Sequence, residues 1–282
     1  METFFTFLEK RVADSSSLLC VGLDPHISDL KEATAEAAFD FCAGLIQRTA
    51  PYAAAFKPNA AFFEQFGADG WAALQRVINA VREQSQRLGS MIPVILDAKR
   101  GDIASTAEAY AKSAFQTLGA HAITLSPYLG RDSIDPFLAD PEKGVFLLCK
   151  TSNPGAGDLQ DLQVCGTDRD GRPNEPLYVT VARLAQSWNL KNNIGLVVGA
   201  TQPAAMALVR AAAPDLWFLA PGVGAQGGEL EAALQAGLRR DGKGLLLPVS
   251  RAISRAADPG RAAAELRDEI INIQYRLTKN SK

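Results

Sequence analysis

The sequence predicts an α/β fold, a single-domain (β/α)8 barrel (TIM barrel) spanning residues 1–282. Short apolar runs typical of strands alternate with longer segments whose apolar residues have helical spacing, and eight such strands are found. A chain of 282 residues with 47% hydrophobic and 21% charged residues has the usual size and composition for one such barrel. The competing doubly wound sheet would need G-x-G-x-x-G after its first strand, where this chain has Gly22-Leu23-Asp24-Pro25.

The first half of the chain supplies four of these strands. Pro25 ends the first strand because proline cannot donate a ladder hydrogen bond, and Pro51 ends the helix that follows. Apolar residues three or four positions apart, such as Phe41 and Leu45, indicate the helices. The expected elements are a strand at 18–23, a helix at about 31–50, a strand at 53–56, a helical region at 62–88 broken near 67–70, a strand from 94, a helix at 103–118 and a strand at 122–125.

The second half begins with a strand at 145–149, followed by a polar segment rich in glycine and proline at about 151–176. This segment is too long for a plain connector, so we expect a lid or a binding loop. The remaining expected elements are a helix at 175–188, a strand at 194–198, a helix at 203–213 with proline in its first turn, a strand at 216–220, a helix at 229–238, a strand at 245–249 and a helix at 261–277.

Three charged residues and a glycine follow the apolar run that ends at Leu96. Period-two alternation along a strand puts Asp97 and Lys99 on one face, about 7 Å apart. Gly101 lets the chain turn, so Asp102 either swings back towards the pair or points away from it. Two carboxylates and an ammonium held together shift one another's proton affinities, as acid/base chemistry requires. In isolation, this pattern is more typical of a solvated charged turn.

The barrel prediction favours the active-site interpretation. Active sites of such barrels lie on the loops at the carboxyl ends of the strands. Polar residues that follow the predicted strands would meet at that end: Asp24, Lys57, Asp97, Lys99, Ser126, Thr151, Gln226 and Arg251.

The loops after the seventh and eighth strands often bind phosphate in barrels. The first of these loops, residues 221–228, contains four glycines whose backbone N–H groups can approach an anion. The second contains Arg251, whose planar guanidinium suits phosphate oxygens. Each feature alone has a plainer interpretation, a flexible turn or a surface ion pair. At this shared position they together predict a phosphate site.

Composition excludes several classes of function. The formal net charge of −2 and a pI near 5.8 do not provide the basic surface that nucleic acid or an anionic membrane would need, although a small anionic ligand needs only a local site. No segment approaches the roughly 20 apolar residues of a membrane helix. The only two histidines, His26 and His121, make a His-rich zinc site or a Ser-His triad a poor fit.

The cysteines and the N-terminus predict a cytoplasmic protein. The cysteines lack a C-x-x-C pair, as expected of reduced thiols in a cytosolic chain; they are Cys20, Cys42, Cys149 and Cys165. The segment Met1–Lys10 mixes Phe4, Phe5 and Phe7 with glutamates, unlike the uninterrupted apolar stretch of a signal peptide.

With these residues assembled, the chain resembles the orotidine 5'-phosphate decarboxylase family, in its longer-loop branch, over essentially its whole length. The most specific motifs are Asp97-Ala98-Lys99-Arg100-Gly101-Asp102-Ile103 and Ala220-Pro221-Gly222-Val223-Gly224-Ala225-Gln226-Gly227-Gly228. Further matches are Phe56-Lys57-Pro58, Ser126-Pro127-Tyr128-Leu129-Gly130 and Arg251-Ala252-Ile253.

The resemblance implies decarboxylation of orotidine 5'-phosphate to UMP and CO2, the last step of de novo UMP synthesis, without a metal or cofactor. It implies that Lys99 protonates C6 as CO2 leaves, flanked by Asp97 and Asp102. The implied substrate-binding residues are Asp24 and Lys57 at the ribose hydroxyls, Ser126 at the pyrimidine, and Pro221, Gln226 and Arg251 in the phosphate motifs. It further implies a homodimer with shared sites, in which Asp102, Ile103 and Thr106 come from the partner chain.

Ser250 departs from a common pattern, because many phosphate-binding barrels have glycine before the arginine that matches Arg251. Three alternatives stay open at this point. They are a Mg²⁺-dependent keto-sugar-phosphate decarboxylase or synthase of the same barrel superfamily, a Schiff-base aldolase that uses Lys57 or Lys99, and a phosphate-ligand binding barrel that has lost turnover. An intact charged set argues against the last, since a pure binder of anions has no use for carboxylates that face its ligand.

Overall fold

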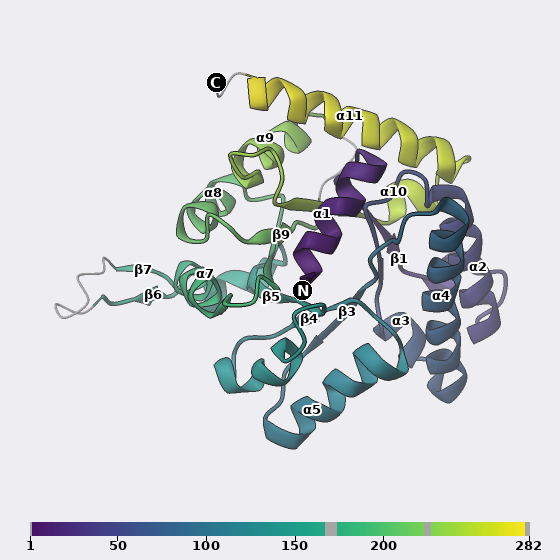
Figure 1. Ribbon diagram of the computed structural model, residues 1–282, viewed down its shortest axis with the longest axis horizontal. Coiled ribbons are helices and arrows are strands. Elements are labelled where there is room, and N and C mark those ends of the chain that lie inside the picture. Colours follow the sequence, from purple (N-terminus) through teal and green to yellow (C-terminus); the bar gives the residue numbers. More distant parts are fainter. Residues whose placement is uncertain (1, 167–173, 223–226, 280–282) are drawn as a thin grey trace.

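The computed structural model describes residues 2–166, 174–222 and 227–279. In these residues, eight parallel strands form one sheet in the order β2-β1-β10-β9-β8-β5-β4-β3. The strands are β1 (Leu19–Leu23), β2 (Ala55–Pro58), β3 (Ile95–Arg100), β4 (Ala122–Leu125), β5 (Gly144–Lys150), β8 (Ile194–Val198), β9 (Trp217–Leu219) and β10 (Leu245–Val249). Two isolated parallel bridges, Phe56 with Val94 and Asn59 with Asp97, join the outer strands β2 and β3. The sheet therefore closes on itself, and the predicted (β/α)8 barrel is confirmed (Figure 1).

Helices surround the barrel and bury one face against it (Figure 1). They are α2 (Ala35–Thr49), α3 (Ala61–Glu64), α4 (Gly67–Leu88), α5 (Ala104–Lys112), α7 (Leu177–Trp188), α8 (Pro203–Ala212), α9 (Gly227–Gly237), α10 (Arg251–Ser254) and α11 (Pro259–Lys279). The predicted break in the region 62–88 lies at Gln65 and Phe66, since α4 already starts at Gly67. No helix in the described part of the chain is both long enough and apolar enough to cross a membrane.

The predicted helix 103–118 is not one regular helix. It begins as α5, then widens into a π-helical turn at Ser113–Thr117 that ends before β4. The backbone at Ala104, in the first turn of α5, has a φ of +47°, a left-handed value that costs free energy for any residue with a Cβ. The helix that follows the charged motif therefore begins from an unfavourable backbone conformation.

An N-terminal helix, α1 (Phe4–Ser15), was not predicted from the sequence. Its phenylalanines pack into the amino end of the barrel, where Phe5 stacks on Trp217 at 6.2 Å between ring centroids and meets Phe146 edge-on at 5.6 Å. A Cβ at Gly144 would lie 2.2 Å from the Phe4 ring, so β5 needs glycine at its first residue. The three phenylalanines of this segment thus mark a helix that closes one end of the barrel.

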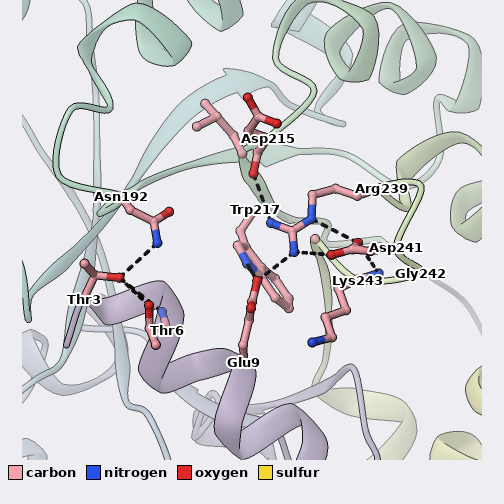
Figure 2. A network of polar contacts seen from close by, with 12 residues as sticks. Thr3, Thr6, Glu9, Asn192, Asp215, Trp217, Arg239, Asp241, Gly242 and Lys243 are labelled. Carbon is pink, nitrogen blue, oxygen red and sulfur yellow. Dashed lines mark hydrogen bonds and ion pairs between the residues drawn. The ribbon is translucent and has the colours of Figure 1, made fainter.

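Polar contacts fix α1 in place (Figure 2). The carboxylate of Glu9 accepts hydrogen bonds from Trp217 Nε1 at 3.3 Å and from Arg239 Nη2 at 2.7 Å. Arg239 in turn pairs with Asp241 at 2.8 Å. At the start of α1, the Thr3 hydroxyl caps the helix by accepting from the Thr6 backbone N–H, and it also accepts from Asn192 Nδ2.

The long segment after β5 contains regular structure. A 3-10 turn (Pro154–Ala156) and α6 (Gly157–Gln160) come first, and β6 (Gln163–Val164) then pairs antiparallel with β7 (Glu175–Pro176). This arm projects from the barrel in Figure 1. Lys150, at the end of β5, anchors α6 through Asp161 at 2.5 Å. Residues 167–173 lie outside the described residues, and a lid role for 151–176 stays a prediction.

Candidate active site

The carboxyl end of β3 is irregular where the charged motif begins. Leu96 pairs with Ile123 of β4, but Arg100 pairs with Leu125. Between these two pairs β3 advances by four residues and β4 by only two, so β3 contains a bulge. Thr124 lies opposite the extra residues. Its Oγ1 accepts from the backbone N–H groups of Ala98 at 3.0 Å and Lys99 at 2.9 Å, which the bulge removes from the ladder. The same hydroxyl donates to Asp97 Oδ1 at 3.0 Å, so its one donor and two acceptor positions are all used.

Asp97 binds two lysines, one on each carboxylate oxygen. Lys99 Nζ donates to Oδ1 at 2.6 Å, and Lys57 Nζ donates to Oδ2 at 3.0 Å from the end of β2. The side chains of Asp97 and Lys57 are only 11% and 9% exposed, whereas that of Lys99 is 49% exposed. The expectation that Asp97 and Lys99 share a face is confirmed, and the structure adds Lys57 as a third charged member.

The two ammonium groups set the charge state of the carboxylate. Burial alone would raise the pKa of Asp97, but the charges and hydrogen bonds of Lys57 and Lys99 outweigh burial and lower the pKa to about 2. Burial likewise disfavours a charged Lys57, yet the carboxylates of Asp97 and Asp24 raise its pKa above the usual lysine value. Asp97 is therefore an anion held between two cations at neutral pH.

Lys99 has a φ of +48°, in the left-handed region that residues with a Cβ rarely adopt. Such a conformation costs on the order of 1 to 3 kcal/mol and persists only where the surroundings impose it. Here the bulge in β3 and the two hydrogen bonds to Thr124 impose it. The strained backbone aims the half-exposed ammonium of Lys99 at Asp97 Oδ1, at the open end of the barrel.

Asp102 does not join this set within the chain. Its Oδ1 accepts from the backbone N–H of Ile103 at 2.8 Å, and no ion pair with Lys99 is formed among the described residues. Ile103 is 52% exposed, and Thr106 is exposed in the first turn of α5. Within the described residues, the pair of Asp97 and Lys99 therefore forms without Asp102.

Asp24 lies at the end of β1, which neighbours both β2 and β10. Its Oδ2 accepts from the Ser250 hydroxyl at 2.5 Å, while Oδ1 is buried without a hydrogen-bond partner in the described part of the chain. Lys57, which Asp24 influences through its charge, lies on the neighbouring strand β2. A buried carboxylate oxygen without a donor is unusual and indicates a position that a ligand can fill.

The matched family model is described as "Orotidine 5'-phosphate decarboxylase / HUMPS family" and covers residues 17–266 of this chain. The chain belongs to this family. It is 50% identical to the orotidine 5'-phosphate decarboxylase of Roseiflexus castenholzii over 278 residues, which cover 95% of this chain and 97% of the relative. The relative of the same name in Thermomicrobium roseum is 47% identical over 281 residues, 96% of this chain and 95% of the relative.

Solved structures of the family agree with the fold. The structure of the Leishmania donovani OMP decarboxylase superposes with a TM-score of 0.85 at 54% identity, over 97% of this chain and 99% of the other. The family match begins after α1, so the helix that closes the amino end of the barrel lies outside it.

The remaining residues expected from the family motifs fall at the same barrel end. Ser126 follows β4, and its backbone lies against Gly101, where a Cβ would be 3.3 Å from the Ser126 carbonyl oxygen. Arg251 is exposed as the first residue of α10; its carbonyl accepts from the Arg255 N–H, and its guanidinium has no hydrogen bond or ion pair with a described residue. Pro221 follows β9, and its carbonyl accepts from the Ala200 N–H. Gln226 lies outside the described residues, as do 223–225.

Two polar contacts of the site, those of Thr124 with Asp97 and of Ser250 with Asp24, were not predicted from the sequence. Thr124 was expected only as part of an apolar strand, although a hydroxyl inside a buried run needs partners and could have suggested a role. The contact of Ser250 with Asp24 crosses 226 positions of sequence, so no local pattern indicates it. Among the described residues, no group of three or more His, Cys, Asp or Glu is arranged to hold a metal ion.

Proposed function

We propose that the carboxyl end of the barrel decarboxylates orotidine 5'-phosphate to UMP and CO2 with Lys99 as the proton donor. The activity follows from the family and from relatives of that name at 47 and 50% identity, which make the chain a carboxy-lyase of pyrimidine biosynthesis. The observation that carries the residue assignment is the contact of Lys99 with an ionised, buried Asp97.

Asp97 would act on the substrate carboxylate by charge repulsion. At roughly 4 Å and an effective dielectric constant near 20, two negative charges repel by about 4 kcal/mol, or about three decades of rate. This repulsion is relieved as CO2 leaves. The electron pair of the broken C–C bond stays on C6, and the Lys99 ammonium delivers a proton to it, which leaves Lys99 as a neutral amine. A localised carbanion needs more stabilisation than repulsion alone provides, so the Lys99 charge also stabilises the transition state.

Distant parts of the substrate would supply further binding energy. We assign the ribose hydroxyls to Asp24 and Lys57, the pyrimidine to Ser126, and the phosphate to Pro221, Gln226 and Arg251. Asp24 Oδ1 and the exposed Arg251 guanidinium, neither of which has a hydrogen-bond partner in the described part of the chain, support two of these assignments. Because remote contacts lower the barrier only when they strengthen in the transition state, the phosphate group would be catalytic without touching the reacting atoms.

The reaction would need no metal ion or cofactor. Both oxygens of Asp97 already accept from ammonium groups, and two cations at 2.6 and 3.0 Å oppose the approach of a third. We therefore expect the purified chain to consume orotidine 5'-phosphate at the same rate with and without excess EDTA. The fall in substrate absorbance measures this rate. Loss of activity on chelation, with recovery on addition of Mg²⁺, would instead favour the keto-sugar-phosphate enzymes.

We also propose a homodimer in which Asp102, Ile103 and Thr106 complete the site of the partner chain. The lack of an Asp102–Lys99 ion pair among the described residues and the exposure of Ile103 and Thr106 support this assignment. A cytoplasmic location agrees with the free state of the four cysteines, of which Cys20, Cys42 and Cys149 are buried.

Mixing two inactive variants tests the shared site. Lys99→Ala and Asp102→Ala chains, each nearly inactive alone, would form heterodimers in which one site carries both defects and the other carries neither. With free subunit exchange, half of the dimers are mixed, so activity should return to about a quarter of the wild-type value. If native mass spectrometry shows exchange while the mixture stays inactive, Asp102 acts within its own chain.

A further inference from the structure

Ser250 connects the ends of two neighbouring strands. It directly follows β10, and Asp24 directly follows β1, whose residue Val21 is in register with Val249. The Ser250 hydroxyl spans the two ends and donates to Asp24 Oδ2 at 2.5 Å. Among the described residues, the Ser250 hydroxyl is the group that donates a hydrogen bond to the Asp24 carboxylate, and it does so to Oδ2 and not to Oδ1.

The Ser250 hydroxyl does not cap the helix that follows it, as the side chain of an N-cap serine usually does. Ser250 is the N-cap residue of α10, where a serine side chain normally accepts from the N–H groups of the first turn. No such side-chain bond is formed in α10. The Ser250 carbonyl accepts from the Ile253 and Ser254 N–H groups, which are the ordinary first hydrogen bonds of the helix. A capping role therefore does not explain this side chain.

Gly22 leaves the space that the hydroxyl occupies. A Cβ at Gly22 would lie 1.8 Å from Ser250 Oγ and 3.2 Å from Asp24 Oδ2. Gly22 is not among the residues with positive φ, so its backbone conformation does not require glycine. The absence of a side chain in the middle of β1 is explained by the contact between Ser250 and Asp24.

The hydrogen bond from Ser250 makes the two oxygens of the Asp24 carboxylate unequal. Oδ2 is held by Ser250, which fixes the rotation of the group, and the buried Oδ1 is left without a donor. A fixed carboxylate with one unsatisfied oxygen is prepared to accept from a hydroxyl at a defined position. Ser250 also precedes Arg251, so the same turn that fixes Asp24 begins the helix that presents the guanidinium.

We infer that Ser250 is a positioning residue that orients Asp24 Oδ1 to accept a hydrogen bond from a hydroxyl of the substrate sugar, and so sets the preference for a ribose over a deoxyribose. This inference rests on the proposed function, in which Asp24 binds the ribose. It adds a residue that touches no substrate atom and a specificity that this residue controls.

Sugar selectivity tests the inference. The kcat and KM are measured for orotidine 5'-phosphate and for its 2'-deoxy and 3'-deoxy analogues, with wild type, Ser250→Ala, Ser250→Thr, Asp24→Asn and Ser254→Ala. Ser254 is a matched control, since it lies in the same short helix and its side chain makes no hydrogen bond with a described residue. Thermal melts establish that each variant is folded.

We expect wild type to prefer the ribose substrate over at least one deoxy analogue, and Asp24→Asn to lose that preference. Ser250→Ala should lower kcat/KM for the ribose substrate by roughly tenfold, mainly through KM, and change the value for that analogue less than threefold. Ser250→Thr, which retains a hydroxyl, should recover most of the preference, and Ser254→Ala should match wild type.

The other outcomes overturn the inference in distinguishable ways. If Asp24→Asn loses the preference while Ser250→Ala keeps it, Asp24 binds the sugar without help and the proposed function stands. If Ser250→Ala lowers kcat/KM equally for all three substrates, its hydroxyl has a general structural role. If wild type shows no preference for either hydroxyl, the assignment of Asp24 to the ribose fails, and the role of Ser250 fails with it.

Discussion

The two ends of the barrel use the same eight strands in opposite ways. At the amino end, α1 covers the opening, its Phe4 and Phe5 are buried, and Glu9 accepts from both Trp217 and Arg239 (Figure 2). At the carboxyl end, Lys99 has a left-handed backbone and Asp24 has a buried oxygen without a partner among the described residues. The comparison shows that this chain packs aromatic side chains at one end and leaves a buried polar atom without a described partner at the end where a ligand would bind.

The costs at the carboxyl end are substantial for one domain. A left-handed lysine and an unsatisfied carboxylate oxygen each cost on the order of 1 to 3 kcal/mol, against a total stability that is typically about 5 to 15 kcal/mol. Burial at the amino end offsets this, since a fully buried phenylalanine contributes about 1.5 to 3 kcal/mol relative to an exposed one. Phe4 and Phe5 are 0% and 1% exposed. Substitutions at the two ends should therefore affect different measurements.

The largest expected effect is at the carboxyl end. Lys99→Ala removes the proposed proton donor and one of the two cations on Asp97, so kcat should fall by roughly 10⁴-fold or more. The melting temperature should change little, because the Lys99 side chain is half exposed. Turnover of orotidine 5'-phosphate and thermal melts check the two expectations. Lys10→Ala, an exposed lysine of α1, is the control, and turnover within tenfold of wild type in Lys99→Ala would remove this residue from the chemistry.

The next effect should appear at the amino end and in stability alone. Phe5→Ala deletes a ring that stacks on Trp217 and meets Phe146, so the free energy of unfolding should fall by about 3 to 5 kcal/mol. The kcat of the folded fraction should stay near the wild-type value. Urea unfolding and turnover at low temperature measure the two quantities. Tyr275→Ala, a 58% exposed aromatic of α11, should cost less than about 0.5 kcal/mol.

The smallest effect depends on pH. His121, which precedes β4 at the amino end, accepts from the Val94 N–H through Nδ1, and burial together with the charges of Lys143 and Arg82 lowers its pKa from 6.5 to about 4. Because the unfolded chain then binds the proton more readily, stability falls as the pH drops from about 6.5 towards 4. Between pH 7 and pH 5 the loss should be about 2 kcal/mol.

Urea unfolding of His121→Asn, which keeps an acceptor but no titrating ring, should lack this share of the pH dependence. An equal fall in the free energy of unfolding of wild type and variant would assign the proton uptake to other groups.

The lowered pKa of Asp97 affects stability in a lower pH range than that of His121. The stability that ionised Asp97 contributes to the fold is present above the ordinary aspartate pKa near 4 and is lost as the pH falls from there towards 2. Acid should therefore weaken the amino end before it discharges Asp97.

The sequence predicts the strands better than it predicts either end of the barrel. Apolar runs bounded by proline and glycine placed all eight strands within a few residues, because burial of a parallel sheet dictates composition directly. Helix α1 was missed because its three phenylalanines were weighed only as a possible signal peptide. Alternation predicted Asp97 and Lys99 on one face, and the two are in contact, but through a bulge and a left-handed backbone at Lys99 that alternation does not predict.

Contacts between distant segments were beyond sequence reasoning. Lys57 and Asp97 are 40 positions apart, and nothing in the spacing of either motif indicates that one pairs with the other. The hydrogen bond between Thr124 and Asp97 depends on a register shift that arises only when β3 and β4 pair. The direction of Asp102 was left open, since glycine at 101 permits both, and its role in a partner chain stays a prediction.

The barrel closes between β2 and β3, where the described backbone contacts are two isolated bridges and the hydrogen bonds from Phe56 N–H to the Pro93 carbonyl and from Ala60 N–H to the Asp97 carbonyl. The Lys57–Asp97 ion pair spans this same junction. An opened barrel would present two free strand edges, which readily pair with other chains and aggregate. The Lys57–Asp97 ion pair therefore helps to hold β2 against β3 and to keep both strand edges covered.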